Sequence, residues 1–249
     1  IPGTGCGPGC CAPAPDHSLS LGYTERDLAA VPNGADLGLG CGNPQAIASL
    51  RQGETVLDLG SGGGFDCFLA ARQVGPEGKV IGVDMTPEMI TRARGNAERI
   101  AAKNVEFRLG EIEHLPVEDS SVDAIISNCV ISLSPDKPAV FREALRVLAP
   151  GGRIAIADIV RTAEMPADVR DDVAALTGCI AGAAAVGELE QMLRDAGFID
   201  VRIQARPHSA EIVQGCFPDR DLSGMIASAT IEAKKPGTSS CCAPTCCGA

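Results

Sequence analysis

A glycine-rich segment that follows a short apolar run is the first place in the sequence where chemistry is expected. Residues 56–66 read V-L-D-L-G-S-G-G-G-F-D, so an apolar run leads directly into Gly60-Ser61-Gly62. Glycines let the backbone turn sharply and let a ligand lie against it. The next apolar run ends in Asp84, at a separation that suits a carboxylate binding the hydroxyls of a ribose. The pattern predicts a site for a nucleoside cofactor.

The charges that flank this glycine loop discriminate between two kinds of cofactor. Dinucleotide-binding loops favour G-x-G-x-x-G, which brings a pyrophosphate to a helix N-terminus. Here Asp58 precedes the loop and Asp66 follows it, and acidic groups suit a cationic ligand better than a pyrophosphate. S-adenosylmethionine carries a sulfonium and an ammonium group and no phosphate, so we expect it as the cofactor. An NAD-binding unit or a catalytically silent Rossmann-like domain is the alternative.

Three of the twelve cysteines occupy places from which they can converge on one site. Cys129 directly follows the fourth expected strand, and Cys179 lies among small residues after the fifth. Cys41 lies in a tight turn, G-L-G-C-G-N-P, before the first strand. Chemistry in open α/β sheets takes place at the carboxyl ends of the strands, so we expect these thiols to meet beside the cofactor. Cysteine is also a common small core residue, and we interpret Cys67 in that way.

The elements that must hold these residues alternate between strand and helix. We expect strands at 55–59, 79–84, 105–108, 122–127 and 153–160, and helices at 64–74, 87–102 and 138–148. Thr86 is expected to cap the second helix, and residues 150–152, P-G-G, to close the third. Later segments predict helices near 167–176 and 187–196 and strands at 201–204 and 225–234, the last antiparallel at or near the sheet edge. This order predicts an α/β fold: a doubly wound, mostly parallel Rossmann-like sheet with a small C-terminal α+β appendage.

Composition limits the class of protein and its partners. The chain has 249 residues, a net charge of −11 and no basic cluster, so we expect no nucleic-acid partner. It contains no secretory signal and no apolar stretch that could span a bilayer, so we expect a cytoplasmic protein with no membrane partner. In a cytosolic protein, a high cysteine count points to metal binding or redox chemistry rather than to a disulfide framework.

Both ends of the chain have a biased composition. The tetrapeptide C-C-A-P occurs near each end among glycines and prolines, a composition that cannot build a packed element. We therefore divide the chain into a flexible Cys-rich arm, a cofactor-binding domain, an acceptor-binding C-terminal part and a flexible Cys-rich tail. These parts span residues 1–17, 18–160, 161–235 and 236–249.

At the level of whole motifs, the sequence resembles one family. The segment D-L-G-S-G-G-G closely resembles the first motif of class I methyltransferases, and residues 18–235 resemble the arsenite S-adenosylmethionine methyltransferases. The segments that carry this resemblance include G-L-G-C-G-N-P at 38–44, V-I-G-V-D-M-T-P at 80–87, F-R-L-G-E-I-E-H-L-P at 107–116 and S-N-C-V-I-S-L-S-P-D-K at 127–137. The sequence differs from the family pattern at two positions: Leu39 stands where some relatives have a tyrosine, and Ser132 stands where many have an asparagine.

The resemblance assigns roles to particular residues. It implies that Cys41, Cys129 and Cys179 are the catalytic, arsenic-binding thiols. It implies that an N-terminal cysteine, Cys10 or Cys11 by spacing, pairs oxidatively with the first of these. It is also consistent with a set of cofactor contacts: Asp58, Gly60, Ser61, Gly62, Asp84, Met85, Ile112, Glu113 and Asn128.

The implied reaction is methylation of thiol-bound trivalent arsenic, a detoxification. Trivalent arsenic is soft and selects thiolate ligands, and its lone pair can attack a sulfonium methyl group without a general base. Reduction of the product would leave a protein disulfide, so the expected partners are arsenite, methylated arsenicals and a thiol reductant of the thioredoxin or glutathione type. The alternatives are a methyltransferase of a small organic acceptor and a non-catalytic metalloid-binding or redox protein.

Overall fold

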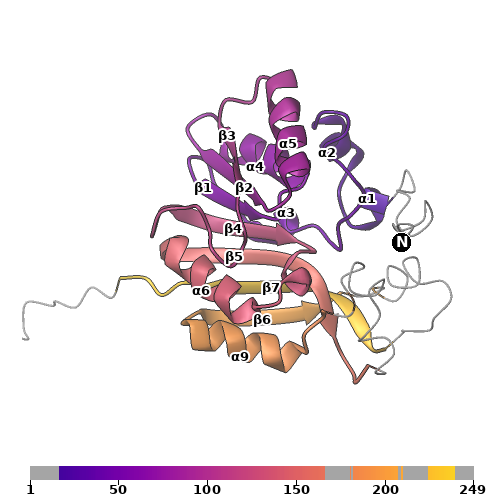
Figure 1. Ribbon diagram of the computed structural model, residues 1–249, viewed down its shortest axis with the longest axis vertical. Helices are drawn as coiled ribbons and strands as arrows, with labels where there is room; N and C mark the ends of the chain where they lie inside the picture. Colours follow the sequence, from indigo (N-terminus) through magenta and orange to yellow (C-terminus); the bar gives the residue numbers. More distant parts are fainter. Residues whose placement is uncertain (1–16, 166–179, 181, 207–208, 210–223, 239–249) are drawn as a thin grey trace, which may run out of the picture.

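One mixed sheet contains all seven strands of the described part of the chain. The computed structural model describes residues 17–165, 180, 182–206, 209 and 224–238. The strand order is β3-β2-β1-β4-β5-β7-β6 (Figure 1). The strands are β1 Thr55–Leu59, β2 Lys79–Asp84, β3 Val105–Leu109, β4 Val122–Asn128, β5 Leu148–Arg161, β6 Ile199–Ala205 and β7 Ile226–Lys234.

The pairing of the strands confirms the predicted fold class. Strands β1 to β5 pair in parallel, whereas β7 is antiparallel to both of its neighbours, β5 and β6. The antiparallel strand therefore lies next to the edge strand β6. The C-terminal α+β part extends the same sheet, because β7 pairs with β5 from Ile226↔Arg161 to Lys234↔Arg153.

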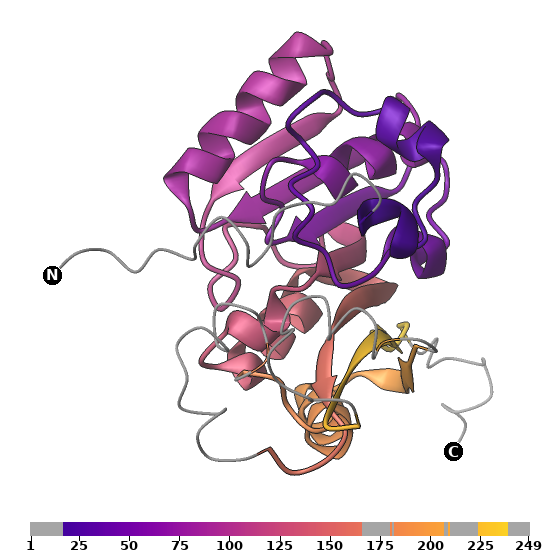
Figure 2. The same ribbon diagram turned by 90° about the vertical axis from the view of Figure 1, so that its right-hand side faces the viewer.

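Helices cover both faces of the sheet, as a doubly wound fold requires (Figure 2). Helices α4 (Phe65–Val74) and α5 (Pro87–Arg99) contribute to a core cluster with Val56, and α6 (Lys137–Val147) and α9 (Val186–Ala196) contribute to one with Leu57. Neighbouring residues of β1 thus point into different clusters, since successive side chains of a strand alternate between faces. The core is mainly aliphatic, since the chain has no Trp, one Tyr and six Phe.

The segment before β1 forms short elements that lie against the glycine loop. They are α1 (His17–Ser20), α2 (Glu25–Ala29) and α3 (Gln45–Ala48). Helix α2 begins with a capping box, in which Thr24 and Asp27 each accept a hydrogen bond from the other's backbone N–H. A Cβ atom on Gly63 would lie 2.9 Å from the Ala35 carbonyl oxygen, so this segment and the loop are in close contact.

The structure differs from the prediction at two helix ends. Thr86 occupies the N-cap position of α5, but its side chain makes no cap hydrogen bond, and its backbone N–H donates to the Asp84 carboxylate. Helix α6 ends at Val147, and β5 begins at Leu148 and includes the P-G-G segment at 150–152. The helix expected near 167–176 lies outside the described residues, as do most residues of the two Cys-rich ends. Among the described helices, none has the length and apolar character needed to cross a membrane.

Candidate active site

The glycine loop turns sharply between β1 and α4. Gly60, Gly62 and Gly64 have φ angles of 71°, 50° and 91°, in the left-handed region that favours glycine. A Cβ atom on Gly60 would lie 2.6 Å from Val130 Cγ2, so this glycine is required by the packing of the chain. A Cβ atom on Gly62 would meet nothing within 4 Å, so the space above this residue is open. The loop therefore offers exposed backbone to a ligand at Gly62.

Asp84 joins the end of β2 to this loop. One of its carboxylate oxygens accepts a hydrogen bond from the Gly62 backbone N–H at 2.9 Å, and the other accepts from the Thr86 backbone N–H at 2.9 Å. These contacts fix the orientation of a partly exposed carboxylate at the carboxyl end of the sheet. The next residue, Met85, is 69% exposed. Two other large apolar side chains are exposed: Leu109, the last residue of β3, and Leu133, the last residue of the 3-10 helix η1 (Ile131–Leu133).

Two buried carboxyl groups lie below the loop. Burial, followed by the charge of Asp66, raises the pKa of Asp58 well above its usual value. Burial also raises the pKa of Asp66 to about 6, against hydrogen bonds from Tyr23 and Asn128 that lower it. The Cys67 thiol is buried and donates to Asp58 at 3.1 Å, as expected for a core cysteine. Asp58 and Asp66, the two acidic residues that flank the glycine loop in the sequence, are therefore buried inside the protein.

Asn128, at the end of β4, is the centre of a hydrogen-bond network. Its Oδ1 atom accepts from the Cys41 backbone N–H at 2.9 Å. Its Nδ2 atom donates to the Gly42 carbonyl at 2.9 Å, to the Tyr23 hydroxyl at 3.1 Å and to Asp66 at 3.3 Å. The Tyr23 hydroxyl in turn donates to Asp66 at 2.8 Å, and burial raises the pKa of Tyr23 well above its usual value. The network joins the N-terminal segment, α4 and β4.

Cys41 and Cys129 meet and form a disulfide, with their Cα atoms 5.4 Å apart. Cys129 follows β4 directly, has a φ angle of 59° and donates its backbone N–H to the Ala157 carbonyl on β5 at 2.8 Å. The two cysteines belong to one small apolar cluster, whose other buried members are Ile159, Met165, Ile180, Ala183 and Ile226. Two of the three thiols singled out in the sequence are thus brought together from segments 88 residues apart.

The remaining predicted residues fall into two groups. Cys10, Cys11 and Cys179 lie outside the described residues, although Ile180 lies in the cluster that contains Cys41 and Cys129. Ile112 and Glu113, two of the expected cofactor contacts, are described, and their surroundings differ. Ile112 is buried in the main core cluster, and the Glu113 carboxylate accepts a hydrogen bond from the Ser134 hydroxyl.

Two site residues were missed in the sequence. The fully buried Ser228, on β7, donates its hydroxyl to the Cys41 carbonyl at 2.6 Å. Arg206, just after β6, donates to the Leu21 carbonyl at 3.0 Å, and its Nη1 atom would lie 3.0 Å from a Cβ on Gly42. Nothing in the local sequence signals either contact, because both partners lie more than 160 residues away.

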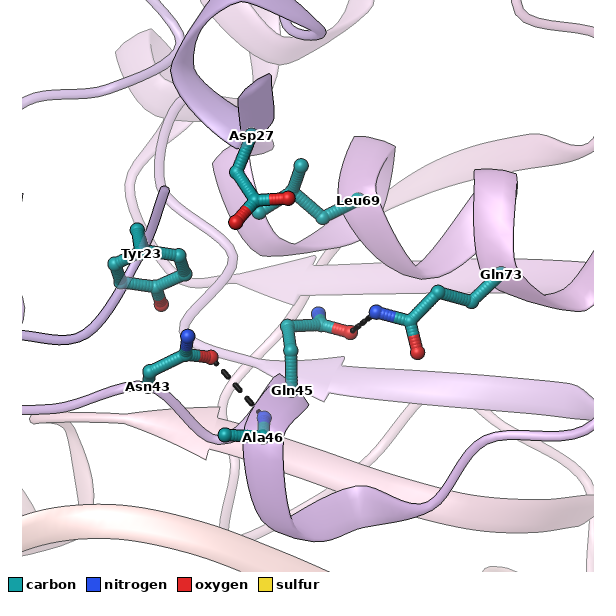
Figure 3. A pocket seen from close by; sticks show the side chains of 7 residues that line it. All are labelled: Tyr23, Asp27, Asn43, Gln45, Ala46, Leu69 and Gln73. Atoms are coloured by element: carbon teal, nitrogen blue, oxygen red, sulfur yellow. Dashed lines mark hydrogen bonds between the residues drawn. The ribbon is translucent and has the colours of Figure 1, made fainter. Parts of the chain in front are cut away.

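A polar pocket lies beside the hydrogen-bond network of Asn128, and no residue of the glycine loop lines it. It is lined by Tyr23, Asp27, Asn43, Gln45, Ala46, Leu69 and Gln73 (Figure 3). Its wall is braced by a hydrogen bond from Gln73 to the Gln45 side chain, at 3.2 Å. None of the cofactor-binding or thiol residues predicted from the sequence lines this pocket, and it shares only Tyr23 with the Asn128 network.

The strand order β3-β2-β1-β4-β5-β7-β6 with antiparallel β7, together with the glycine loop after β1 and the carboxylate at the end of β2, is that of a class I methyltransferase. In agreement, a family model described as "Methyltransferase domain" matches residues 50–197. The arsenite methyltransferase of Halobacterium salinarum is 58% identical over 92% of this chain and 59% of its own length. That of Aquipseudomonas alcaligenes is 43% identical over 66% of this chain and 49% of its own length.

A solved structure extends these matches. An arsenic(III) S-adenosylmethionine methyltransferase from Chlamydomonas reinhardtii is 33% identical, with a TM-score of 0.67, over 91% of this chain and 75% of that one. The chain belongs to the arsenite methyltransferase family. It spans about half the length of the curated relatives that it matches.

Proposed function

We propose that this chain transfers methyl groups from S-adenosylmethionine to trivalent arsenic held by the thiols of Cys41, Cys129 and Cys179. The disulfide between Cys41 and Cys129 supports this proposal most directly, because one arsenic atom can only be shared by thiols that can reach each other. Ile180, the residue that follows Cys179 in the sequence, packs in the same cluster as Cys41 and Cys129, which supports Cys179 as the third ligand.

The residues at the carboxyl edge of the sheet fit S-adenosylmethionine. The open space above Gly62 admits a ligand to the loop backbone, and the carboxylate of Asp84 can accept hydrogen bonds from ribose hydroxyls. Exposed Met85 offers an apolar surface to a flat adenine ring. Asp84 is the partly exposed carboxylate beside the loop and favours a cation over a phosphate, whereas Asp58 and Asp66 are buried. When bound, this cofactor supplies a methyl group on a sulfonium, which is an acceptor for a lone pair.

The thiols would hold the arsenic atom and orient its lone pair. Three thiols replace the three hydroxyl groups of arsenous acid, with loss of water, and leave arsenic with a lone pair. Attack on the methyl carbon involves no proton, so the site needs no general base. The proposal therefore gives His17, His114 and Asp84 no role as a base. The protein contributes proximity and orientation, which are large effects when the reacting atoms are held within van der Waals distance.

The thiols would also supply electrons. Transfer of the methyl group would break its bond to the sulfonium sulfur, release the cofactor as a neutral thioether and raise arsenic to the pentavalent state. Two of the three thiolates would then leave arsenic together as a disulfide, and the two electrons that they give up would return arsenic to the trivalent state. The Cys41–Cys129 bond is of the kind that such a step produces. A dithiol reductant of the thioredoxin or glutathione type would reopen it by thiol–disulfide exchange. In this proposal the enzyme acts in detoxification inside a reducing cytoplasm.

Product speciation tests the proposal. Purified protein is incubated with arsenite, S-adenosylmethionine and a dithiol, and methylated arsenicals are separated and quantified. We expect methylated products from the wild type, and a loss of at least a hundredfold in rate for Cys129→Ser and Cys179→Ser. Cys67→Ala is the control for removal of a cysteine, and we expect it to keep the methylation rate, because this thiol is buried against Asp58 and takes no part in the disulfide. Wild-type rates in both serine variants would refute the assignment.

A further inference from the structure

Both backbone polar groups of Cys41 are held by side chains from distant strands. We propose that Asn128 and Ser228 are positioning residues that clamp Cys41 opposite Cys129, and that Tyr23 and Asp66 set the orientation of the Asn128 amide. The proposal rests on the proposed function only in taking Cys41 and Cys129 to be arsenic ligands. It gives Asn128 a role toward the thiol segment that is separate from any contact with the cofactor.

The clamp consists of two hydrogen bonds. The Cys41 N–H donates to Asn128 Oδ1 at 2.9 Å, and the Cys41 carbonyl accepts from Ser228 Oγ at 2.6 Å. Cys41 is 6% exposed and lies in neither a helix nor a strand, so no regular structure satisfies these groups. Buried backbone groups without partners are costly, so the two side chains determine where this turn can settle.

The glycines on either side of Cys41 make the clamp possible. A Cβ atom on Gly40 would lie 2.9 Å from Asn128 Nδ2, and one on Gly42 would lie 2.7 Å from the Ala157 Cβ. Real Cβ atoms do not approach other atoms so closely. The G-C-G motif is therefore explained by contact of this turn with Asn128 at the end of β4 and with Ala157 on β5, rather than by a need for flexibility.

The orientation of the amide follows from its other contacts. Three acceptors, the Gly42 carbonyl, the Tyr23 hydroxyl and an Asp66 oxygen, surround Nδ2 at 2.9 to 3.3 Å. A flipped amide would direct its oxygen at the Gly42 carbonyl and at Asp66, and would lose the bond to the Cys41 N–H. Tyr23 also donates to Asp66, so the hydroxyl is held in place to receive Nδ2. The network thus allows only one orientation, the one that binds Cys41.

A fixed Cys41 raises the effective concentration of its thiol near Cys129. Rigid placement of two groups favours any bond between them or to a shared atom, because less freedom is lost when the bond forms. The same clamp therefore favours both a disulfide and a shared arsenic atom. This gives a readout that needs neither arsenite nor S-adenosylmethionine.

The test measures the Cys41–Cys129 disulfide equilibrium in Ser228→Ala. The protein is equilibrated in mixtures of reduced and oxidised dithiothreitol, and differential alkylation with mass spectrometry gives the oxidised fraction of the two cysteine peptides. Loss of one buried hydrogen bond should shift this equilibrium toward the thiols about three- to tenfold. Ser127→Ala is the matched control, because Ser127 is also fully buried and donates to a backbone carbonyl, that of Leu59, at 3.2 Å. Equal shifts in the two variants would overturn the proposal.

Tyr23→Phe keeps the test decisive if Ser228→Ala does not fold. This change removes only the hydroxyl, and we expect a shift of the disulfide equilibrium in the same direction, with weaker arsenite binding and an unchanged affinity for S-adenosylmethionine. An unchanged equilibrium would reject the role of Tyr23 and Asp66 in orienting the amide. If the equilibrium shifts in the variants while the wild type methylates no arsenite, the clamp stands and the proposed function falls.

Discussion

Asp66 makes a quantitative prediction about stability, because its carboxyl group is buried and close to another acid. The folded chain holds the pKa of Asp66 at about 6, mainly through burial, whereas the ordinary value is 3.8. Asp66→Asn keeps the shape of the side chain and removes the titration. The variant can still accept from Tyr23, although its amide nitrogen would face the Nδ2 atom of Asn128.

The sign of the effect follows from where the proton is held. Below pH about 4 both the folded and the unfolded chain keep the Asp66 proton, and the group does not affect stability. As the pH rises from about 4 to about 6, the unfolded chain releases the proton first, so folding becomes less favourable. A pKa raised from 3.8 to about 6 corresponds to a loss of about 3 kcal/mol above this window.

The assay compares wild type with Asp66→Asn from pH 4 to pH 7.5 in urea. Unfolding is followed by circular dichroism, because the chain has no Trp and a single Tyr. Using both proteins in the same buffers removes the contributions of carboxyl groups that do not interact with Asp66, whereas Asp58, whose pKa is raised by burial and then by the charge of Asp66, contributes to the difference. We expect the free energy of unfolding of wild type, relative to the variant, to fall by about 3 kcal/mol across the window and then to stay constant. A difference that is flat, or that rises with pH, would refute the reasoning.

Four further changes test other parts of the structure. Gly42→Ala should reduce the oxidised fraction of Cys41 and Cys129 at a given dithiol ratio, measured by differential alkylation, because its Cβ would lie 2.7 Å from Ala157. Gly95→Ala, in α5 with no atom within 4 Å of the new Cβ, should instead stabilise the protein by about 0.5–1 kcal/mol in urea unfolding. Arg153→Met should lower the free energy of unfolding by about 2–4 kcal/mol, because it removes bonds to the Ala48 and Ser49 carbonyls and to both oxygens of Glu54. Asp84→Asn should weaken binding of S-adenosylmethionine roughly tenfold by calorimetry and leave arsenite binding unchanged.

The sheet was predictable because each of its buried strands is a continuous local signal. β1 matches the predicted residues 55–59, and β4 extends the predicted run by one residue, Asn128. The glycine loop and Asp84 were also predictable, because each directly follows a short apolar run in the sequence. The antiparallel β7 could be recognised by its alternation, and its place beside β5 follows only from the folded chain.

The interior of the site could not be predicted to the same extent. Asn128 contacts Tyr23 across 105 residues and Asp66 across 62, and neither separation leaves a local pattern. The short helices α1 and α2 have too few residues for periodicity to reveal them. Family resemblance could indicate that Cys41 and Cys129 belong together, but it could not show that Ser228 holds the first of them.

The bond from Ser228 to Cys41 has a consequence for how the protein is made. Ser228 follows Cys41 by 187 residues and lies on β7, the last strand of the described part of the chain. During synthesis the turn with Cys41 emerges long before the strand that holds its carbonyl, so the thiol pair cannot reach its final geometry on a partly made chain. Nascent chains that end before β7 therefore present Cys41 without the hydroxyl group of Ser228.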